Sequence, residues 1–218
     1  MIGVYGYASR AVLVAVAALF LGCSGQATAA PCGAVVSIAT HDGTATRVSM
    51  AGPLPRAVLL LLAGGGGHLD LDDEGCPRAL AGNSLVRMAP ILRELGFATV
   101  LVDAPSDHPG EDGLAGFRGD AKHAADLALI MADARQRIAA PVWLAGTSRG
   151  TISAVNAASR LKGAAGPDGV VLTSALMSGG KGNKSWVRDS VFDHELSAIT
   201  VPLLLIGHGG DKCLRSPP

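Results

Sequence analysis

Short, continuous apolar runs alternate along the chain with longer segments whose apolar residues recur at helical spacing, and this alternation limits the fold more than any other feature. Buried strands are expected at residues 56–67, 97–105, 141–146, 169–175 and 201–209. Helices are expected at residues 84–96, 119–138 and 150–163. Uninterrupted strands of Val, Leu and Ile that alternate with helices are typical of a parallel sheet covered on both faces. The sequence therefore predicts an α/β fold with a mostly parallel sheet.

Two shorter strands precede this series. The segments "VVSIAT" (35–40) and "TATRVSM" (44–50) flank Asp42-Gly43, a favoured hairpin turn, so an antiparallel hairpin is expected at the N-terminal edge of the sheet. Pro90 is expected to kink or split the helix in which it lies. His123 falls within another expected helix, where we predict it at the surface or at the edge of the core.

The length and composition fit one folded domain. A chain of 218 residues with 49% hydrophobic and 17% charged residues can bury a sizeable core and is unlike a disordered chain. The formal net charge is +0, so no basic surplus points to a nucleic-acid partner. No group of His, Asp and Cys has the spacing of a metal site, and the glycine-rich segments fail the nucleotide-binding patterns. We therefore expect neither a metal nor a cofactor.

The N-terminus has the features of an export signal. Arg10 precedes the apolar run "AVLVAVAALFLG", which is shorter than the roughly 20 residues of a membrane span. Cleavage is expected after Ala29, which gives a signal peptide at 1–29 and a domain at 30–218 in the periplasm or outside the cell. Lipidation at Cys23, in the segment "FLGC", and a retained anchor helix are the alternatives. No other stretch is long enough to span a bilayer.

Export places the domain where disulfides persist. Removal of the signal leaves three cysteines, Cys32, Cys76 and Cys213. Cys32 and Cys76 are a possible pair, which would leave Cys213 without a partner.

The segment "VWLAGTSRGT" carries the clearest chemistry. Gly146-Thr147-Ser148-Arg149-Gly150 fits G-x-S-x-G, with an expected strand before it and an expected helix after it. In this context the serine lies on a sharp, strained turn that lifts its hydroxyl above the sheet, and small flanking residues let strand and helix pack closely. Ser148 is therefore predicted as a nucleophile. The backbone N–H of Arg149, at a helix N-terminus, is predicted to stabilise an oxyanion.

Two other strand ends complete the predicted site. The run Gly64–Gly67 follows a strand, and a backbone N–H there, at Gly65 or next at Gly66, is the expected second oxyanion donor. Asp211 follows the last expected strand, where a triad acid belongs, with Asp193 and Glu195 as the runners-up.

These features together resemble the α/β-hydrolase superfamily. The likeness covers most of residues 34–213, with "NSLVRMAPILRELGFATVLVDAPSD", "VWLAGTSRGTISAVNAA" and "VFDHELSAITVPLLLIGHGGDKC" similar to exported bacterial hydrolases of undefined substrate. The resemblance implies Ser148 as nucleophile, Asp211 as acid, and backbone donors at Arg149 and near Gly65. It also implies a histidine after the acid, in a loop after one more strand.

No histidine follows Asp211 in this sequence. We therefore expect the domain to be incomplete at its C-terminus, without its last strand, a helix and the histidine, and expect the strand "VPLLLIG" to be an exposed apolar edge that lowers solubility. The predicted function is a serine hydrolase of the esterase or lipase-like kind, acting on a small-molecule ester or acyl substrate, with little activity in this chain. A non-catalytic exported binding protein and an acyltransferase are the alternatives.

Overall fold

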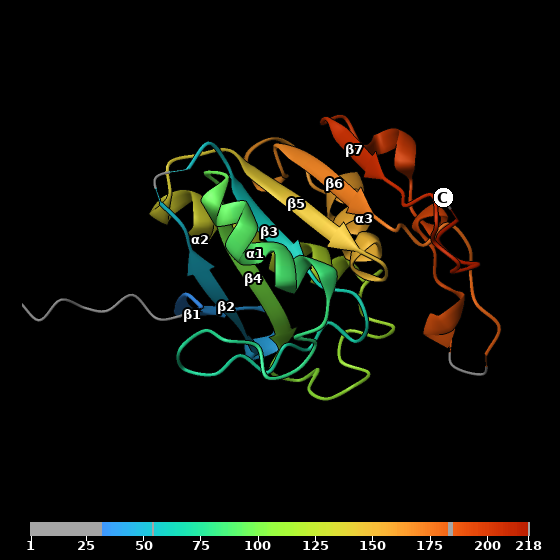
Figure 1. Cartoon of the computed structure of the whole chain (residues 1–218), viewed down its shortest axis with the longest axis horizontal. Coiled ribbons are helices and arrows are strands. Elements are labelled where there is room, and N and C mark those ends of the chain that lie inside the picture. Colours follow the sequence, from blue (N-terminus) through green and yellow to red (C-terminus); the bar gives the residue numbers. More distant parts are fainter. Residues whose placement is uncertain (1–31, 54, 183–184, 218) are drawn as a thin grey trace, which may run out of the picture.

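The computed structural model describes residues 32–53, 55–182 and 185–217. A seven-stranded sheet with the strand order β1-β2-β4-β3-β5-β6-β7 runs through the molecule (Figure 1). The strands are β1 (Ala34–Ala39), β2 (Ala45–Ala51), β3 (Val58–Leu62), β4 (Ala98–Pro105), β5 (Val142–Thr147), β6 (Gly169–Thr173) and β7 (Leu203–Ile206). From β4 to β7 every pairing is parallel, while β1 pairs with β2 and β2 with β4 in antiparallel register. The predicted mixed sheet with an N-terminal hairpin is confirmed.

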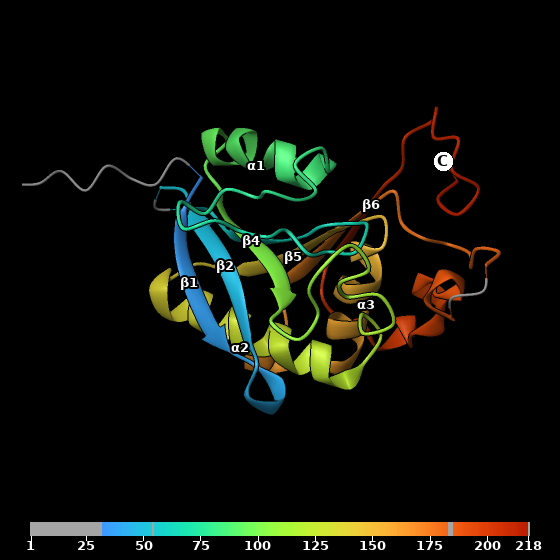
Figure 2. The same cartoon turned by 90° about the horizontal axis from the view of Figure 1, so that it is seen from below.

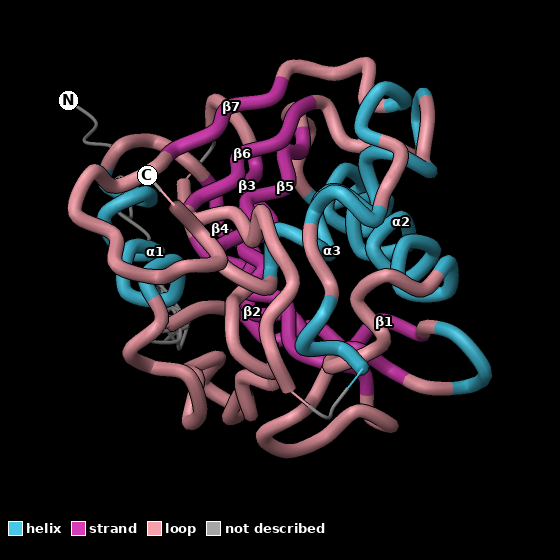
Figure 3. The backbone as a smooth tube through the Cα atoms, turned by 90° about the vertical axis from the view of Figure 1, so that its right-hand side faces the viewer, coloured by secondary structure: helices cyan, strands magenta, loops and turns pink. Residues whose placement is uncertain are grey.

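Within the described residues, three α-helices cover the sheet from both sides: α1 (Ser84–Glu94), α2 (Ala121–Arg137) and α3 (Gly150–Arg160). The helix α1 lies on one face, and α2 and α3 lie side by side on the other (Figures 2 and 3). The short 3-10 helices are η1 (His41–Gly43), η2 (Gly163–Ala165), η3 (Ser185–Arg188), η4 (Val191–Asp193) and η5 (Leu196–Ala198).

The core has two layers because successive residues of each strand point to opposite faces of the sheet. Along β3, Leu60 packs with the α2 and α3 side chains, which include Leu127 and Val155. Leu61, the next residue, packs with Leu85 on α1 instead. The uninterrupted apolar runs of the sequence predicted strands that are buried on both faces, and β3 confirms this.

The helix α1 begins as predicted but does not break at Pro90. Asn83 is its N-cap, because its side chain accepts a hydrogen bond from the Leu85 N–H at 3.1 Å, and Gly96 follows its end with φ +86°. The prediction that Pro90 splits the segment is wrong, since the helix continues to Glu94. The alternative, a kink at Pro90, stays a prediction. The proline ring is exposed, while Leu85 and Ala89 are buried on the sheet side and hold the helix in place.

The strand β7 lies at one edge of the sheet and is exposed along its whole length. Leu203, Leu204, Leu205 and Ile206 are 44%, 52%, 49% and 45% exposed. An apolar groove of about 510 Å³ runs along the α1 face of the sheet, from α1 to Ile206 at the end of β7. The predicted exposed apolar edge is therefore confirmed, and its effect on solubility stays a prediction.

The disulfide prediction is also confirmed. Cys32 is bonded to Cys76, and Cys213 is a free, exposed cysteine. Among the described residues, no helix has the length and apolar character needed to cross a membrane. The predicted signal cleavage after Ala29 and the alternative lipidation at Cys23 lie outside the described residues.

Candidate functional site

Ser148 lies at the sharp turn between β5 and α3. Its φ of +50° is in the left-handed region that non-glycine residues rarely adopt, so the turn is strained, as predicted for a nucleophile. The Ser148 N–H donates to the Thr173 carbonyl at 3.1 Å, which ties the turn to β6. The Ser148 carbonyl accepts the Thr151 hydroxyl at 2.6 Å, which ties it to the first turn of α3. These bonds from both sides hold the strained conformation.

The two glycines of the motif are required by close backbone packing. A Cβ on Gly146 would lie 2.5 Å from the Gly150 carbonyl oxygen. A Cβ on Gly150 would lie 2.0 Å from the Leu62 carbonyl oxygen, at the end of β3. The spacing of G-x-S-x-G thus lets the start of α3 approach β5 and β3, as the sequence predicted.

The glycine loop after β3 lies directly beside the serine. A Cβ on Gly64 would lie 3.0 Å from the Ser148 Cβ, so a side chain there would crowd Ser148. Gly65 has φ +59°, which favours glycine. The Gly67 N–H donates to the Gly64 carbonyl at 3.1 Å and closes the loop. The predicted oxyanion donors, Gly65 and Gly66, therefore lie in a loop that borders Ser148.

Arg149 is the N-cap residue of α3 and is partly buried. Its backbone N–H lies at the positive end of that helix. Burial lowers the pKa of its guanidinium, and the charge of Arg215 lowers it further. The backbone N–H of Arg149, the predicted oxyanion donor, thus lies at the start of α3, directly after the predicted nucleophile Ser148.

A buried arginine supports the glycine loop, and sequence reasoning missed it. The Arg118 guanidinium donates to the carbonyls of Ala63, at 2.9 Å, and Gly65, at 3.3 Å. Because the Gly65 carbonyl is held toward Arg118, the opposite side of that peptide, the Gly66 N–H, is turned away from it. Arg118 therefore helps to orient the peptide that carries a predicted oxyanion donor. Its segment, "LAGFRGD", has no local pattern that marks such a role.

The same guanidinium connects to His123 through a hydroxyl. Arg118 donates to the Ser153 Oγ at 2.8 Å, and His123 Nε2 lies 2.9 Å from that Oγ. Burial lowers the pKa of Arg118 to about 9, and the nearby Arg149 adds to the effect. Burial, followed by the charge of Arg118, lowers the pKa of His123 to about 3. His123 is therefore neutral at physiological pH.

The prediction that His123 lies at the surface or at the edge of the core is wrong. Its exposed fraction is 3%, because the α2 face that carries it packs against α3 and the polar Ser153 lies opposite. The sequence around His123 does not indicate that its partner is the Ser153 hydroxyl, because Ser153 lies on another helix.

Asp211 follows β7, as predicted, and its carboxylate is held locally. It accepts the Cys213 N–H at 2.9 Å and the Ser216 hydroxyl at 3.2 Å. The Cys213 N–H is the main reason that the pKa of Asp211 is lowered, so the group is a carboxylate at neutral pH. Both runners-up have local partners: Asp193 accepts from the Ser190 backbone at 2.7 Å, and Glu195 accepts from the Ser197 hydroxyl.

Within the described part of the chain, no histidine side chain is hydrogen-bonded to Ser148 Oγ or to the Asp211 carboxylate. His68 accepts the Gly110 N–H at 3.2 Å, and His208 accepts the Gly210 N–H at 3.1 Å. Among the described residues, the structure thus brings the predicted nucleophile and the predicted oxyanion loop together and hydrogen-bonds no histidine to Ser148 Oγ.

A cavity of about 370 Å³ lies beside the glycine loop and is lined by His68, Asp70, Ala79, Leu80, Gly110 and Glu111. Leu80 connects the cavity to the loop, because a Cβ on Gly65 would lie 3.1 Å from its side chain. The cavity is large enough to hold a small acyl or alcohol group.

No protein-family model matches the chain, and no curated protein matches its sequence. Solved structures do match it. A lidless α/β serine hydrolase from Xanthomonas campestris is 20% identical, with a TM-score of 0.53, over 85% of this chain and 74% of that one. An α/β serine hydrolase homologue from Coxiella burnetii is 18% identical, with a TM-score of 0.53, over 84% of this chain and 76% of that one. A cold-adapted esterase from an Arctic intertidal metagenomic library is 17% identical, with a TM-score of 0.56, over 84% of this chain and 75% of that one.

The three matches cover 84–85% of this chain, whose mostly parallel sheet has helices on both faces. The chain therefore has the α/β-hydrolase fold.

Proposed function

We propose that this protein is a serine hydrolase of the esterase or lipase-like kind, which cleaves a carboxylic ester or related acyl bond through an acyl-enzyme on Ser148. The observation that carries the proposal is the left-handed φ of +50° at Ser148. A strained serine between a strand and a helix, bordered by a glycine loop, is the arrangement that acyl transfer needs. The hydrolases and esterases among the matching structures support the same reaction class.

The chemistry divides into two steps. Ser148 Oγ attacks the carbonyl carbon, and the carbonyl oxygen takes negative charge that the backbone N–H groups of Arg149 and of Gly65 or Gly66 stabilise. The alcohol leaves with a proton, and water then releases the acid and frees the serine. A base must take the hydroxyl proton as the Oγ–carbon bond forms.

The dependence on a base gives a direct test. Imidazole in solution can take the serine proton where no described histidine does. We expect imidazole to stimulate hydrolysis of a small p-nitrophenyl ester by the purified protein, at least about 10-fold above the rate with Ser148→Ala. Ser37→Ala is the matched control, because Ser37 is an exposed serine on β1, at the edge of the sheet opposite β7. It should keep the stimulated rate.

Equal rates for the wild type and Ser148→Ala would contradict the proposal. That outcome would favour the second candidate, a non-catalytic binding protein on a hydrolase scaffold, which is supported by the absence of a base at Ser148 among the described residues. An acyltransferase would use the same residues. Addition of an alcohol to the assay distinguishes the two activities. An ester of that alcohol, formed in place of the free acid, would indicate acyl transfer.

We also propose that the protein is exported and works in the periplasm or outside the cell. The Cys32–Cys76 disulfide supports this proposal, because disulfides persist in oxidising compartments. Mass spectrometry of the mature N-terminus tests it. A chain that begins at Ala30 indicates a cleaved signal, one that begins at a lipid-modified Cys23 indicates a lipoprotein, and an intact N-terminus on protein recovered from the cytoplasm would contradict export.

A further inference from the structure

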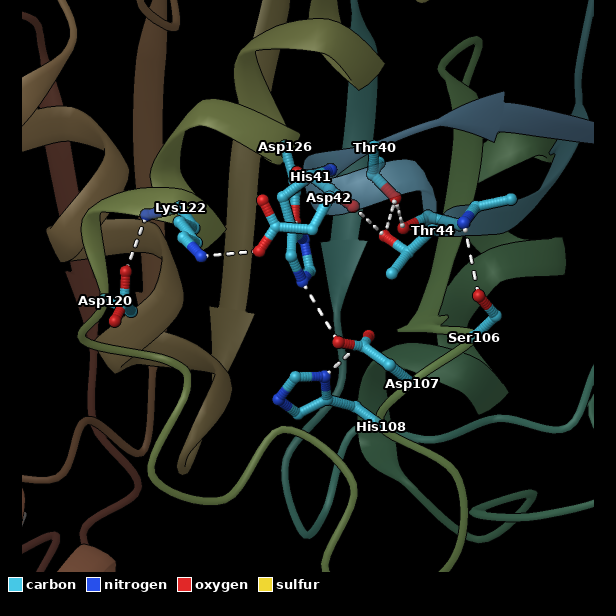
Figure 4. A network of polar contacts seen from close by, with 12 residues as sticks. Thr40, His41, Asp42, Thr44, Ser106, Asp107, His108, Asp120, Lys122 and Asp126 are labelled. Carbon is cyan, nitrogen blue, oxygen red and sulfur yellow. Dashed lines mark hydrogen bonds and ion pairs between the residues drawn. The ribbon is translucent and has the colours of Figure 1, made fainter.

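A second group of polar side chains meets at the same end of the sheet as Ser148, on the far side of β3. His41 lies in η1, Asp107 and His108 follow β4, and Asp126 lies in α2 (Figure 4). In the strand order, β4 is separated from β5, which carries Ser148, by β3 alone. The group is distinct from the candidate hydrolase site, and its sequence spacing gives no motif, since 66 residues separate His41 from Asp107.

The His41 ring is fixed in one orientation. Its Nδ1 lies 2.6 Å from an Asp126 carboxylate oxygen, and its backbone N–H donates to the other oxygen at 2.9 Å. The Asp126 side chain is only 3% exposed, so this carboxylate has a fixed place in the structure. Its hold on Nδ1 directs the other ring nitrogen, Nε2, toward Asp107 at 3.2 Å.

A buried carboxylate that orients a histidine from behind is a recurrent feature of metal sites, where it fixes the tautomer and makes the ligating nitrogen more basic. Asp107 lies between the two histidines: one oxygen is near His41 and the other is 2.8 Å from His108 Nδ1. We propose that His41, Asp107 and His108 bind a divalent transition-metal ion, with Zn²⁺ as the best match, and that Asp126 positions His41 for it.

The geometry fits such an ion. One ligand atom from each of the three residues lies within 4.8 Å of the other two. Ligand atoms about 2.0–2.1 Å from a tetrahedral zinc are separated by roughly 3.3 Å. The 3.2 Å between His41 Nε2 and Asp107 is close to this separation, and the 2.8 Å between His108 Nδ1 and Asp107 would widen as the ion enters. Asp107 is 43% exposed and His41 is 8% exposed, so the ion can enter from solvent and keep a water as its fourth ligand.

The ligand set also discriminates between metals. Two imidazoles and one carboxylate suit Zn²⁺, whereas Ca²⁺ and Mg²⁺ prefer sites built of oxygen ligands. Phe117 packs against both imidazoles, with ring centroids 4.8 Å from His41 and 4.3 Å from His108, and so keeps one side of the site apolar. The ion would tie the β1–β2 turn to the loop after β4 and, through Asp126, to α2.

Zinc binding by the purified, untagged, metal-free protein tests the proposal. The free cysteines are first alkylated, so that Cys213 cannot bind the ion. Competition with a chromogenic chelator should give one Zn²⁺ per chain, and zinc should raise the Tm. His108→Ala and Asp107→Asn are expected to weaken binding by more than about 10-fold, and Asp126→Asn by about 10-fold. His208→Ala, which changes an exposed histidine elsewhere, should bind as the wild type does.

Circular dichroism of each variant confirms that it is folded, and Co²⁺ adds a spectroscopic readout. Cobalt absorption bands with the intensity of a four-coordinate site, lost in His108→Ala, would support the assignment. Two results would overturn it: no stoichiometric zinc binding by the wild type, or binding that His108→Ala and Asp107→Asn leave unchanged. In either case the cluster is a network of ion pairs only.

Discussion

At the scale of single residues, the candidate site depends on positions where a side chain would not fit. Gly150→Ala would place a Cβ 2.0 Å from the Leu62 carbonyl oxygen, so the start of α3 would have to move away from β3. We expect a loss of roughly 1–3 kcal/mol in the free energy of unfolding, measured by urea denaturation. Gly82→Ala is the matched control, because nothing lies within 4 Å of its added Cβ. Equal stability of the two variants would contradict this packing.

The buried His123 predicts a dependence of stability on pH. Its pKa is lowered to about 3 in the folded protein, against 6.5 in the unfolded chain, mainly by burial. Between these values the unfolded chain binds more protons, so the stabilising contribution is complete above pH 6.5 and is lost as the pH falls toward 3. Between pH 6.5 and pH 5 we expect a loss of roughly 2 kcal/mol from this residue.

Denaturation of two variants at both pH values isolates the effect. His123→Gln should lose less stability than the wild type between pH 6.5 and pH 5, by roughly that 2 kcal/mol. His208→Gln, at an exposed position, should behave as the wild type does. The same pH dependence in His123→Gln as in the wild type would show that the buried imidazole is not its source.

At the scale of elements, the strands and most helix bounds could be predicted because period and composition are local properties. The expected strand at 97–105 is β4 at Ala98–Pro105, and the expected helix at 119–138 is α2 at Ala121–Arg137. Pro90 shows where local reasoning fails: packing of α1 on the sheet outweighs the lost hydrogen bond. The support that Arg118 gives to the glycine loop could not be predicted, because the two loop carbonyls that it binds lie 53 and 55 residues away.

The exposed strand β7 predicts how the molecule associates in solution. An apolar edge strand can pair with another chain, so we expect the protein to aggregate as its concentration rises. Leu204→Lys places a charge on that edge and should lower the aggregated fraction in light scattering and size-exclusion chromatography. Leu129→Lys is the control: Leu129 is 48% exposed, like Leu204 at 52%, but lies on α2. If both variants reduce aggregation equally, the β7 edge is not its cause.

At the scale of the whole molecule, the parallel sheet gathers chemistry from distant parts of the chain at the carboxyl ends of its strands. The turn after β5 carries Ser148, the loop after β3 carries the glycines, and the loop after β4 carries Asp107 and His108. Sequence motifs predicted the first two groups, because each is contiguous along the chain. The third is assembled from separate segments by the β2–β4 and β1–β2 pairings, so the order of the strands had to be known first.

We propose Ser148 as the nucleophile. Treatment with a fluorophosphonate in the presence of imidazole tests it most directly, because the serine oxygen displaces fluoride and stays bonded to phosphorus. Peptide mapping by mass spectrometry then locates the adduct. We predict one adduct per chain, on the peptide that contains Ser148, and none on that peptide in Ser148→Ala. An adduct at another residue that persists in Ser148→Ala, or no adduct in the wild type, would contradict the claim.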